Sequence, residues 1–277
     1  MTREARPLVF LGTPNAAATV LSELIRNGFE IAHVVTRADA RRGRGSATTP
    51  SPVKQVAIDN GLDVSHDMTW LQENSHRELL GVVVAYGKII PSSVLSHIPM
   101  VNIHFSLLPR WRGAAPVERA ILAGDMRTGV CIMNVEETLD TGDVFARREI
   151  EILETHTSEN LTEDLAVVGG QLLVDTLNEG LGTGEPQHGE TTYATKVSTD
   201  ELRLDWNVSS IEVLRRVRAV RSYTMIGSQR LKIIHAEPLQ DPAHLTPGQC
   251  DGAGVVGTSD GTVRLVSVQP EGKAVMD

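Results

Sequence analysis

The 277-residue sequence has two cysteines and no long apolar segment. Cys131 and Cys250 lie far apart without C-x-x-C spacing, which argues against a disulfide framework and a thiolate metal site. No run of about 18 apolar residues occurs, and the start, MTREARPLVFLG, contains no apolar signal region. We therefore expect a soluble, cytoplasmic protein with no membrane partner.

Several common cofactor motifs are also absent. The turn Gly12-Thr13-Pro14 follows a predicted strand, but it lacks the G-x-G-x-x-G pattern, and no G-x-x-x-x-G-K-[ST] occurs. No H-E-x-x-H or similar histidine spacing is present. These absences disfavour dinucleotide, nucleotide and metal binding. No fixed-period repeat occurs, which makes a solenoid or propeller improbable.

The net charge of −9 argues against broad nucleic-acid binding, because phosphate contacts need clustered lysine and arginine. The charge is unevenly distributed, however. Residues 37–44 carry four arginines and residues 203–232 carry seven basic side chains, whereas residues 134–164 hold ten carboxylates. The two basic islands are candidate RNA contacts.

Short apolar runs alternate with helix-like stretches over the first two thirds of the chain. This alternation predicts an α/β fold, a Rossmann-like and mostly parallel sheet with helices on both faces. Such sheets bind ligands at the carboxyl ends of their strands. The expected strands are residues 8–12, 30–36, 82–87, 101–106, 129–135 and 144–152, and the expected helices are 14–27, 51–60, 114–123 and 157–181.

The last third has a different pattern. Residues 182–200 are rich in Gly, Thr and Pro without an apolar period, which predicts a linker, residues 184–203, between domains 1–183 and 204–277. A helix at 209–220 and short strands at 230–236, 254–258 and 262–268 favour a small OB-like β-barrel. Barrels of this kind often bind nucleic acid.

The segment VNIHFSLLPRWRGAAP at 101–116 is the most informative for chemistry. Asn102, His104 and Ser106 alternate with apolar residues, so on a strand they share one face. Polar side chains at the end of a buried strand are typical of a catalytic site. A satisfied core histidine beside a capping asparagine is the alternative.

A second polar segment, Glu136 to Asp143, leaves the next predicted strand and could bring Asp140 near His104. A carboxylate beside a histidine favours the imidazolium and fixes the ring, which can then stabilise a developing oxyanion. Asn102 could supply a second donor. This trio suits acyl transfer to an amine without a covalent intermediate. Asp140 alone could be a turn residue, and a Ser106–His104–Asp140 triad is disfavoured because Ser106 lacks the G-x-S-x-G turn.

The loop RADARRGRGSATTP at 37–50 is basic and glycine-containing, so it could meet phosphates or stack on bases. The alternative is a solvated loop without a binding role. Trp111 lies between two arginines and is equally ambiguous, since it could contact RNA or plug a ligand-site loop.

Together these motifs resemble the methionyl-tRNA formyltransferase family over nearly the whole chain. The matching segments are F-L-G-T-P at 10–14, G-R-G at 43–45, P-S-P-V-K at 50–54, V-V-A-Y-G at 83–87, S-L-L-P-R-W-R-G-A-A-P at 106–116 and L-D-T-G-D at 139–143. The wider folate-dependent formyltransferase group, including amino-sugar enzymes, shares the Asn, His, S-L-L-P and D-x-x-G-D pattern.

The resemblance implies formyl transfer from 10-formyltetrahydrofolate to initiator methionyl-tRNA, without a metal and by a monomer. The barrel is then expected to hold tRNA. The implied roles are catalysis by Asn102, His104 and Asp140, folate binding by Ser106, Leu107, Leu108, Pro109 and Tyr86, and tRNA binding by Arg41, Arg42 and Arg44.

The chain departs from the family pattern at its end. It stops just after Q-P-E-G-K, which predicts a shortened barrel and endangers tRNA affinity more than chemistry. Two rival functions are a formyltransferase for a small amine, which would ignore the basic loop, and an RNA-binding protein without turnover. The complete Asn102, His104 and Asp140 set argues against the second.

Overall fold

The computed structural model describes residues 3–41, 48–239 and 244–277. The chain divides into two compact units, each with its own core. Unit 1 comprises Met1–Pro116, Arg127–Glu151 and Leu161–Ala194, and unit 2 comprises Val117–Met126, Ile152–Asn160 and Thr195–Asp277.

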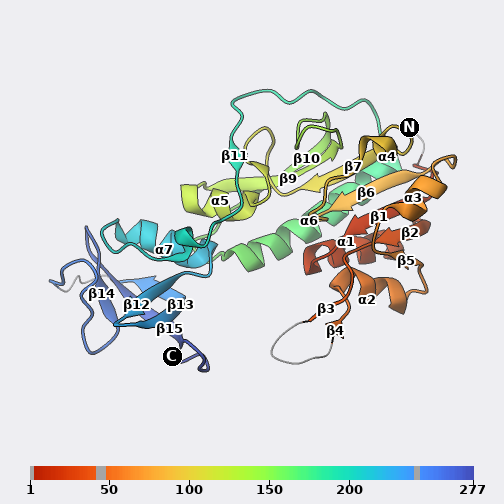
Figure 1. The fold of residues 1–277 in the computed structure, drawn as a ribbon. Helices are drawn as coiled ribbons and strands as arrows, with labels where there is room; N and C mark the ends of the chain where they lie inside the picture. The colour runs from red at the N-terminus through yellow and green to blue at the C-terminus, as the bar shows by residue number, and fades with distance from the viewer. Residues whose placement is uncertain (1–2, 42–47, 240–243) are drawn as a thin grey trace. The chain divides into compact units, whose positions relative to one another are not determined.

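Unit 1 is built on a seven-stranded sheet with the order β10-β9-β7-β6-β1-β2-β5 (Figure 1). The five strands from β7 to β5 are parallel, and β9 and β10 are antiparallel to their neighbours. The predicted mostly parallel sheet is therefore confirmed. The strands are β1 (Leu8–Gly12), β2 (Ile31–Val35), β5 (Val64–Ser65), β6 (Leu80–Val84), β7 (Met100–His104), β9 (Arg127–Asn134) and β10 (Val144–Glu151).

Helices cover both faces of this sheet, as predicted. On one face, Gly169 of α6 (Ser158–Glu179) lies so close to β7 that an added Cβ would be 2.9 Å from Ile103. On the other face, Leu71 and Val94 join a core cluster with Met100 and residues of β1 and β6. Leu71 belongs to α3 (Thr69–Glu73) and Val94 to α4 (Ser92–Leu95), while α1 (Asn15–Arg26) and α2 (Pro52–Asp59) complete the helices of this unit.

The alternation of side chains along β7 places the polar residues of this strand. Met100 points into the α3–α4 cluster and Ile103 contacts α6 on the opposite face. Since side chains two apart share a face, Asn102 and His104 lie on the α3–α4 side at the carboxyl end of the strand. They are paired in register with Met133 and Cys131 of β9.

Unit 2 contains a curled antiparallel sheet with the order β12-β13-β15-β14, consistent with the predicted OB-like domain. Its helix α7 (Ser210–Ala219) begins with a capping box formed by Ser209 and Glu212, which satisfies backbone N–H groups of the first turn. Val213 and Val217 of α7 pack in the core of the sheet. The strands are β12 (Tyr223–Ile226), β13 (Gln229–Pro238), β14 (Val255–Gly257) and β15 (Thr262–Pro270), and α5 (Pro116–Ala123) and η1 (Asp200–Leu202) precede α7.

The predicted linker, residues 184–203, divides between the units. Its first part ends with β11 (Tyr193–Ala194), which pairs in parallel with β8 (Arg112–Gly113) in unit 1. Unit 2 resumes at Thr195. The domain boundaries at 183/184 and 203/204 stay predictions.

Within the described ranges, none of the helices combines the length and apolar character needed to cross a membrane.

Candidate active site

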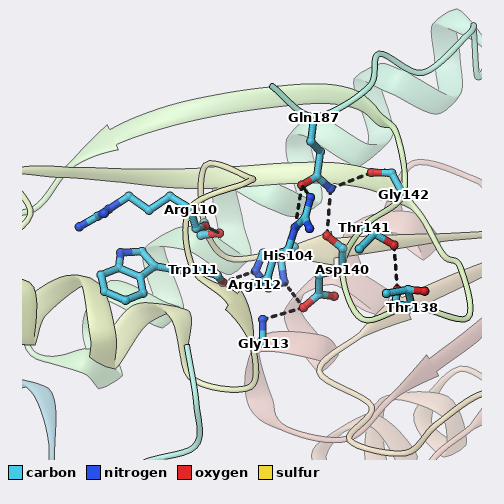
Figure 2. Close-up of polar contacts among 11 residues, drawn as sticks. His104, Arg110, Trp111, Arg112, Gly113, Thr138, Asp140, Thr141, Gly142 and Gln187 are labelled. Carbon is cyan, nitrogen blue, oxygen red and sulfur yellow. Dashed lines mark hydrogen bonds and ion pairs between the residues drawn. The ribbon is translucent and has the colours of Figure 1, made fainter. Parts of the chain in front are cut away.

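His104 is buried at the end of β7, and both nitrogens of its ring face oxygen atoms (Figure 2). Nε2 lies 2.9 Å from the carbonyl oxygen of Trp111, and Nδ1 lies 3.6 Å from Oδ2 of Asp140. A carbonyl oxygen can only accept, so Nε2 carries the proton of this hydrogen bond. A second proton, on Nδ1, would make the ring an imidazolium facing a carboxylate.

Asp140 lies in the turn after β9, where sequence reasoning placed it. Its Oδ2 also accepts a hydrogen bond of 2.8 Å from the backbone N–H of Gly113. The Asp140 backbone has a φ of 53°, which costs a non-glycine residue of order 1–3 kcal/mol. The same turn needs glycine at 142, because an added Cβ there would lie 2.1 Å from the carbonyl oxygen of Asn134. The surrounding contacts therefore hold this carboxylate in its position.

Trp111 holds the other side of His104 through its own strained backbone, with a φ of 63°. The guanidinium of Arg110 lies 4.5 Å from the centre of the Trp111 indole. The Trp111 backbone N–H donates to the hydroxyl of Thr192 at 2.9 Å. The W-R-G segment therefore supports His104.

Asn102 is half-buried on the same face as His104, two residues earlier. Within residues 3–41, 48–239 and 244–277, its amide makes no hydrogen bond, so it can serve a ligand. Ser106 does not continue this face: β7 ends at His104, and the Ser106 hydroxyl is fully buried and donates to the carbonyl oxygen of Arg110 at 2.6 Å. The expected alternation thus stops because the chain turns after β7.

The S-L-L-P loop folds back over the face of the sheet that carries His104. Leu108 is buried against Cys131, Met133 and Val144, and Pro109 is buried, while Leu107 is half-buried. Burial raises the pKa of the Cys131 thiol, which keeps this cysteine protonated in the core.

Tyr86 follows β6 at the same end of the sheet, and its side chain is buried. Its hydroxyl has no hydrogen-bond partner among the described residues. Burial, with a smaller contribution from Asp67, raises the pKa of Tyr86, so the hydroxyl stays protonated at neutral pH. A buried hydroxyl of this kind is available to a polar ligand.

Gln187 (Figure 2) and Thr192 come from the segment predicted as a linker, and both were missed by sequence reasoning although they complete the site. The Gln187 amide contacts the carbonyl oxygens of Asp140 and Gly142 and also the guanidinium of Arg112. A single glutamine in a stretch without apolar period carries no sequence signal, and only the tertiary structure brings it to the site.

The structure describes the two basic islands to different extents. Arg42 and Arg44 lie outside the described residues, and Arg41 ends β3 (Ala40–Arg41), which pairs with β4 (Thr48–Thr49). In the second island, three arginines are engaged inside unit 2: Arg216 donates to the Glu201 carbonyl, Arg218 to the carbonyls of Leu153 and His156, and Arg221 to the Glu159 carboxylate. Part of this charge therefore stabilises the fold.

The described part of the chain contains no group of three or more His, Cys, Asp or Glu placed to hold a metal ion. The candidate site thus consists of a histidine with a carboxylate partner, an available amide and a buried hydroxyl. This set can stabilise negative charge on an oxygen atom and bind a polar ligand.

The comparisons with known proteins agree with this chemistry. The Formyl transferase family pattern matches residues 6–177, and the pattern of the Formyl transferase C-terminal domain matches residues 196–277. The fold and the site therefore define a formyl transferase.

Two curated relatives are methionyl-tRNA formyltransferases. The protein of Corynebacterium aurimucosum is 41% identical over 306 residues, covering 98% of this chain and 92% of the relative. The protein of Clavibacter sepedonicus is 42% identical over 287 residues, covering 97% and 94%. The chain belongs to the methionyl-tRNA formyltransferase family.

Solved structures share the fold at lower identity. The N-formyltransferase from Helicobacter canadensis, crystallised with folinic acid and dTDP-3-aminofucose, superposes with a TM-score of 0.72 at 18% identity, covering 94% of this chain and 98% of that one. HypX from Aquifex aeolicus, crystallised with tetrahydrofolic acid, gives a TM-score of 0.68 at 19% identity, covering 98% of this chain and 45% of that one.

Proposed function

We infer that this chain transfers the formyl group of 10-formyltetrahydrofolate to the amino group of methionine on initiator methionyl-tRNA, for translation initiation. The observation that carries this conclusion is the burial of His104 between Asp140 and the Trp111 carbonyl, in a chain with full-length methionyl-tRNA formyltransferase relatives. The methionyl amine attacks the formyl carbon, the bond from that carbon to N10 breaks, and the amine proton is lost as N10 gains one.

We assign the catalytic roles to Asn102 and His104, with Asp140 acting through the histidine. In the imidazolium, Nδ1–H faces Asp140, and Nε2–H can leave the Trp111 carbonyl to donate to the formyl oxygen as negative charge develops there. The Asn102 amide supplies a second donor from the same face of β7. A donor positioned before the reaction, as the Asn102 amide is, lowers the barrier because it needs no reorganisation.

The polar groups of the site fit the folate co-substrate, which supplies the activated formyl group. The buried Tyr86 hydroxyl and the Asn102 amide are the donors available to it, and Ser106, Leu107, Leu108 and Pro109 shape the loop beside it. Because the Ser106 hydroxyl is already bonded to Arg110, we assign this serine a role in shaping the loop. We then assign direct contact with the folate to the neighbouring residues of this loop.

For the tRNA we propose Arg41, Arg42 and Arg44 as contacts near the acceptor end, with further contacts on the C-terminal domain, residues 204–277. The net charge of −9 makes local basic groups necessary for binding a polyanion.

We further propose that the protein is monomeric and that it acts in the cytoplasm, where charged tRNA is used. Light scattering at micromolar concentration tests the first point, and subcellular fractionation tests the second.

The deciding experiment is formyl transfer from 10-formyltetrahydrofolate to methionyl-initiator tRNA, measured by acid-stable product. Charged elongator tRNA, free methionine and a nucleotide-linked amino sugar serve as alternative acceptors. We expect product with the initiator alone. Transfer to the amino sugar without any to tRNA would replace this function by that of a small-amine formyltransferase.

A further inference from the structure

One side chain, that of Gln187, joins the two loops that hold His104. Its Nε2 donates to the carbonyl oxygen of Asp140 at 2.9 Å and to that of Gly142 at 2.8 Å. Its Oε1 accepts from Nε and Nη2 of Arg112 at 3.0 and 2.6 Å. Carbonyls only accept and guanidinium only donates, so the amide orientation is fixed by its partners.

The backbone around Gln187 is anchored on both sides. Before it, Glu185 and Val144 exchange two backbone hydrogen bonds of 2.8 and 2.9 Å at the start of β10. After it, Thr192 accepts from the backbone N–H of Arg112 at 2.9 Å and, through its hydroxyl, from that of Trp111. The glutamine is therefore presented at a fixed position between the two loops.

The loops that Gln187 joins each control one side of the histidine. Arg112 lies between Trp111, whose carbonyl accepts from His104, and Gly113, whose N–H binds the Asp140 carboxylate. On the other side, Gln187 binds the carbonyl of Asp140 itself, within the left-handed backbone that aims the carboxylate at His104. All four hydrogen bonds of the Gln187 amide therefore hold segments that position the His104 ring.

We propose that Gln187 is a positioning residue for formyl transfer: it holds Asp140 and the Arg112 segment so that His104 is oriented for the reaction. This inference rests on the proposed roles of His104 and Asp140. A misplacement of about 1 Å in a reacting group can cost about 100-fold in rate, so loss of this brace should lower kcat.

Two substitutions separate the functions of the amide. Gln187→Glu keeps an acceptor for Arg112 but sets a carboxylate against the carbonyls of Asp140 and Gly142. Gln187→Met keeps the length and removes all four hydrogen bonds without adding charge. Gln55→Glu is the matched control, because Gln55 is an exposed glutamine on α2 whose side chain bonds only Asp59 among the described residues.

The test measures kcat and KM for methionyl-tRNA and for the folate co-substrate in the full-length wild type and in these variants, with thermal unfolding recorded for each. We expect Gln187→Glu and Gln187→Met to lower kcat about 10- to 100-fold, with both KM values within about threefold of wild type. Gln55→Glu should behave as wild type. If the Gln187→Glu variant fails to fold, the kcat of the Gln187→Met variant decides whether the inference holds.

A double-mutant cycle with Asp140→Asn distinguishes positioning from a general structural role. If Gln187 acts through Asp140, adding Gln187→Glu to Asp140→Asn should lower kcat by less than about threefold further, because the two losses overlap. Fully multiplicative losses, a kcat within twofold of wild type, or an effect confined to KM would overturn the inference. If Asp140→Asn alone leaves kcat unchanged, the proposed roles of the site fail instead.

Discussion

Replacing Asp140 by asparagine removes the charge beside His104 while keeping the shape of the side chain. The asparagine oxygen can still accept from the Gly113 N–H, so the turn should persist. At the observed 3.6 Å, two unit charges attract by about 1 kcal/mol in bulk water and by about 4–5 kcal/mol at an effective dielectric constant near 20.

The burial of both groups decides between these limits. The His104 and Asp140 side chains are 6% and 12% exposed, so the larger value is the better guide. A loss of about 4–5 kcal/mol in stabilisation of the imidazolium corresponds to a rate reduction of about 1000- to 5000-fold. Asp140→Asn should therefore lose most of its kcat.

The assay is single-turnover formylation of methionyl-initiator tRNA with enzyme in excess, quenched on the millisecond to second scale. Glu137→Gln is the matched control, because it removes the same charge from an exposed side chain of the same loop. Circular dichroism and thermal unfolding confirm that both variants fold. A rate above one third of wild type in Asp140→Asn would refute the electrostatic argument.

Three further predictions concern other parts of the molecule. His33 is buried and stacked on Trp70, and burial lowers its pKa despite an opposing effect of Asp63, so the unfolded chain binds this proton more readily. Stability should thus fall as pH drops below about 6.5, and His33→Phe should flatten that slope in urea titrations between about pH 5 and 7; an unchanged slope would contradict this. Hydrogen bonding from Arg119 lowers the pKa of Glu201 from 4.5 to about 2, so its contribution is present above pH 4.5 and lost as pH falls toward 2. Glu201→Gln should reduce the loss of Tm over that range, by a modest amount because the pair is partly exposed. Arg44→Ala should weaken tRNA binding and reduce its salt dependence in filter-binding titrations, leaving folate binding intact; an unchanged salt slope would exclude this contact.

Much of the fold follows from local pattern. The apolar runs at 8–12 and 129–135 are strands because they are buried on both faces. The parallel arrangement of the five strands from β7 to β5 follows from the helices in the connections between them, whereas β9 is antiparallel to β7. Elements with a weaker pattern were not predicted from the sequence. β12 is four residues long, with two of them exposed, so it carries little apolar signal and forms because β13 pairs with it.

The sequence by itself determined the chemistry available at the strand ends. Period-two alternation puts Asn102 and His104 on one face of β7. The polar turn after β9 offers Asp140 as a carboxylate, but β9 is antiparallel to β7 and ends beside Val101, so the contact of Asp140 with His104 depends on the folded path of that turn. The alternation along β7 is local, because it depends on a few neighbouring residues.

Only the tertiary structure decided how these groups are held. The Trp111 carbonyl that fixes His104, and the Gln187 and Thr192 side chains that fix the two loops, come from segments without periodic pattern. Trp111 and Thr192 are separated by 81 positions along the chain, and their contact depends on the path of everything between them. Hydrogen bonds between irregular segments have no sequence period, so they become visible only when the chain is folded.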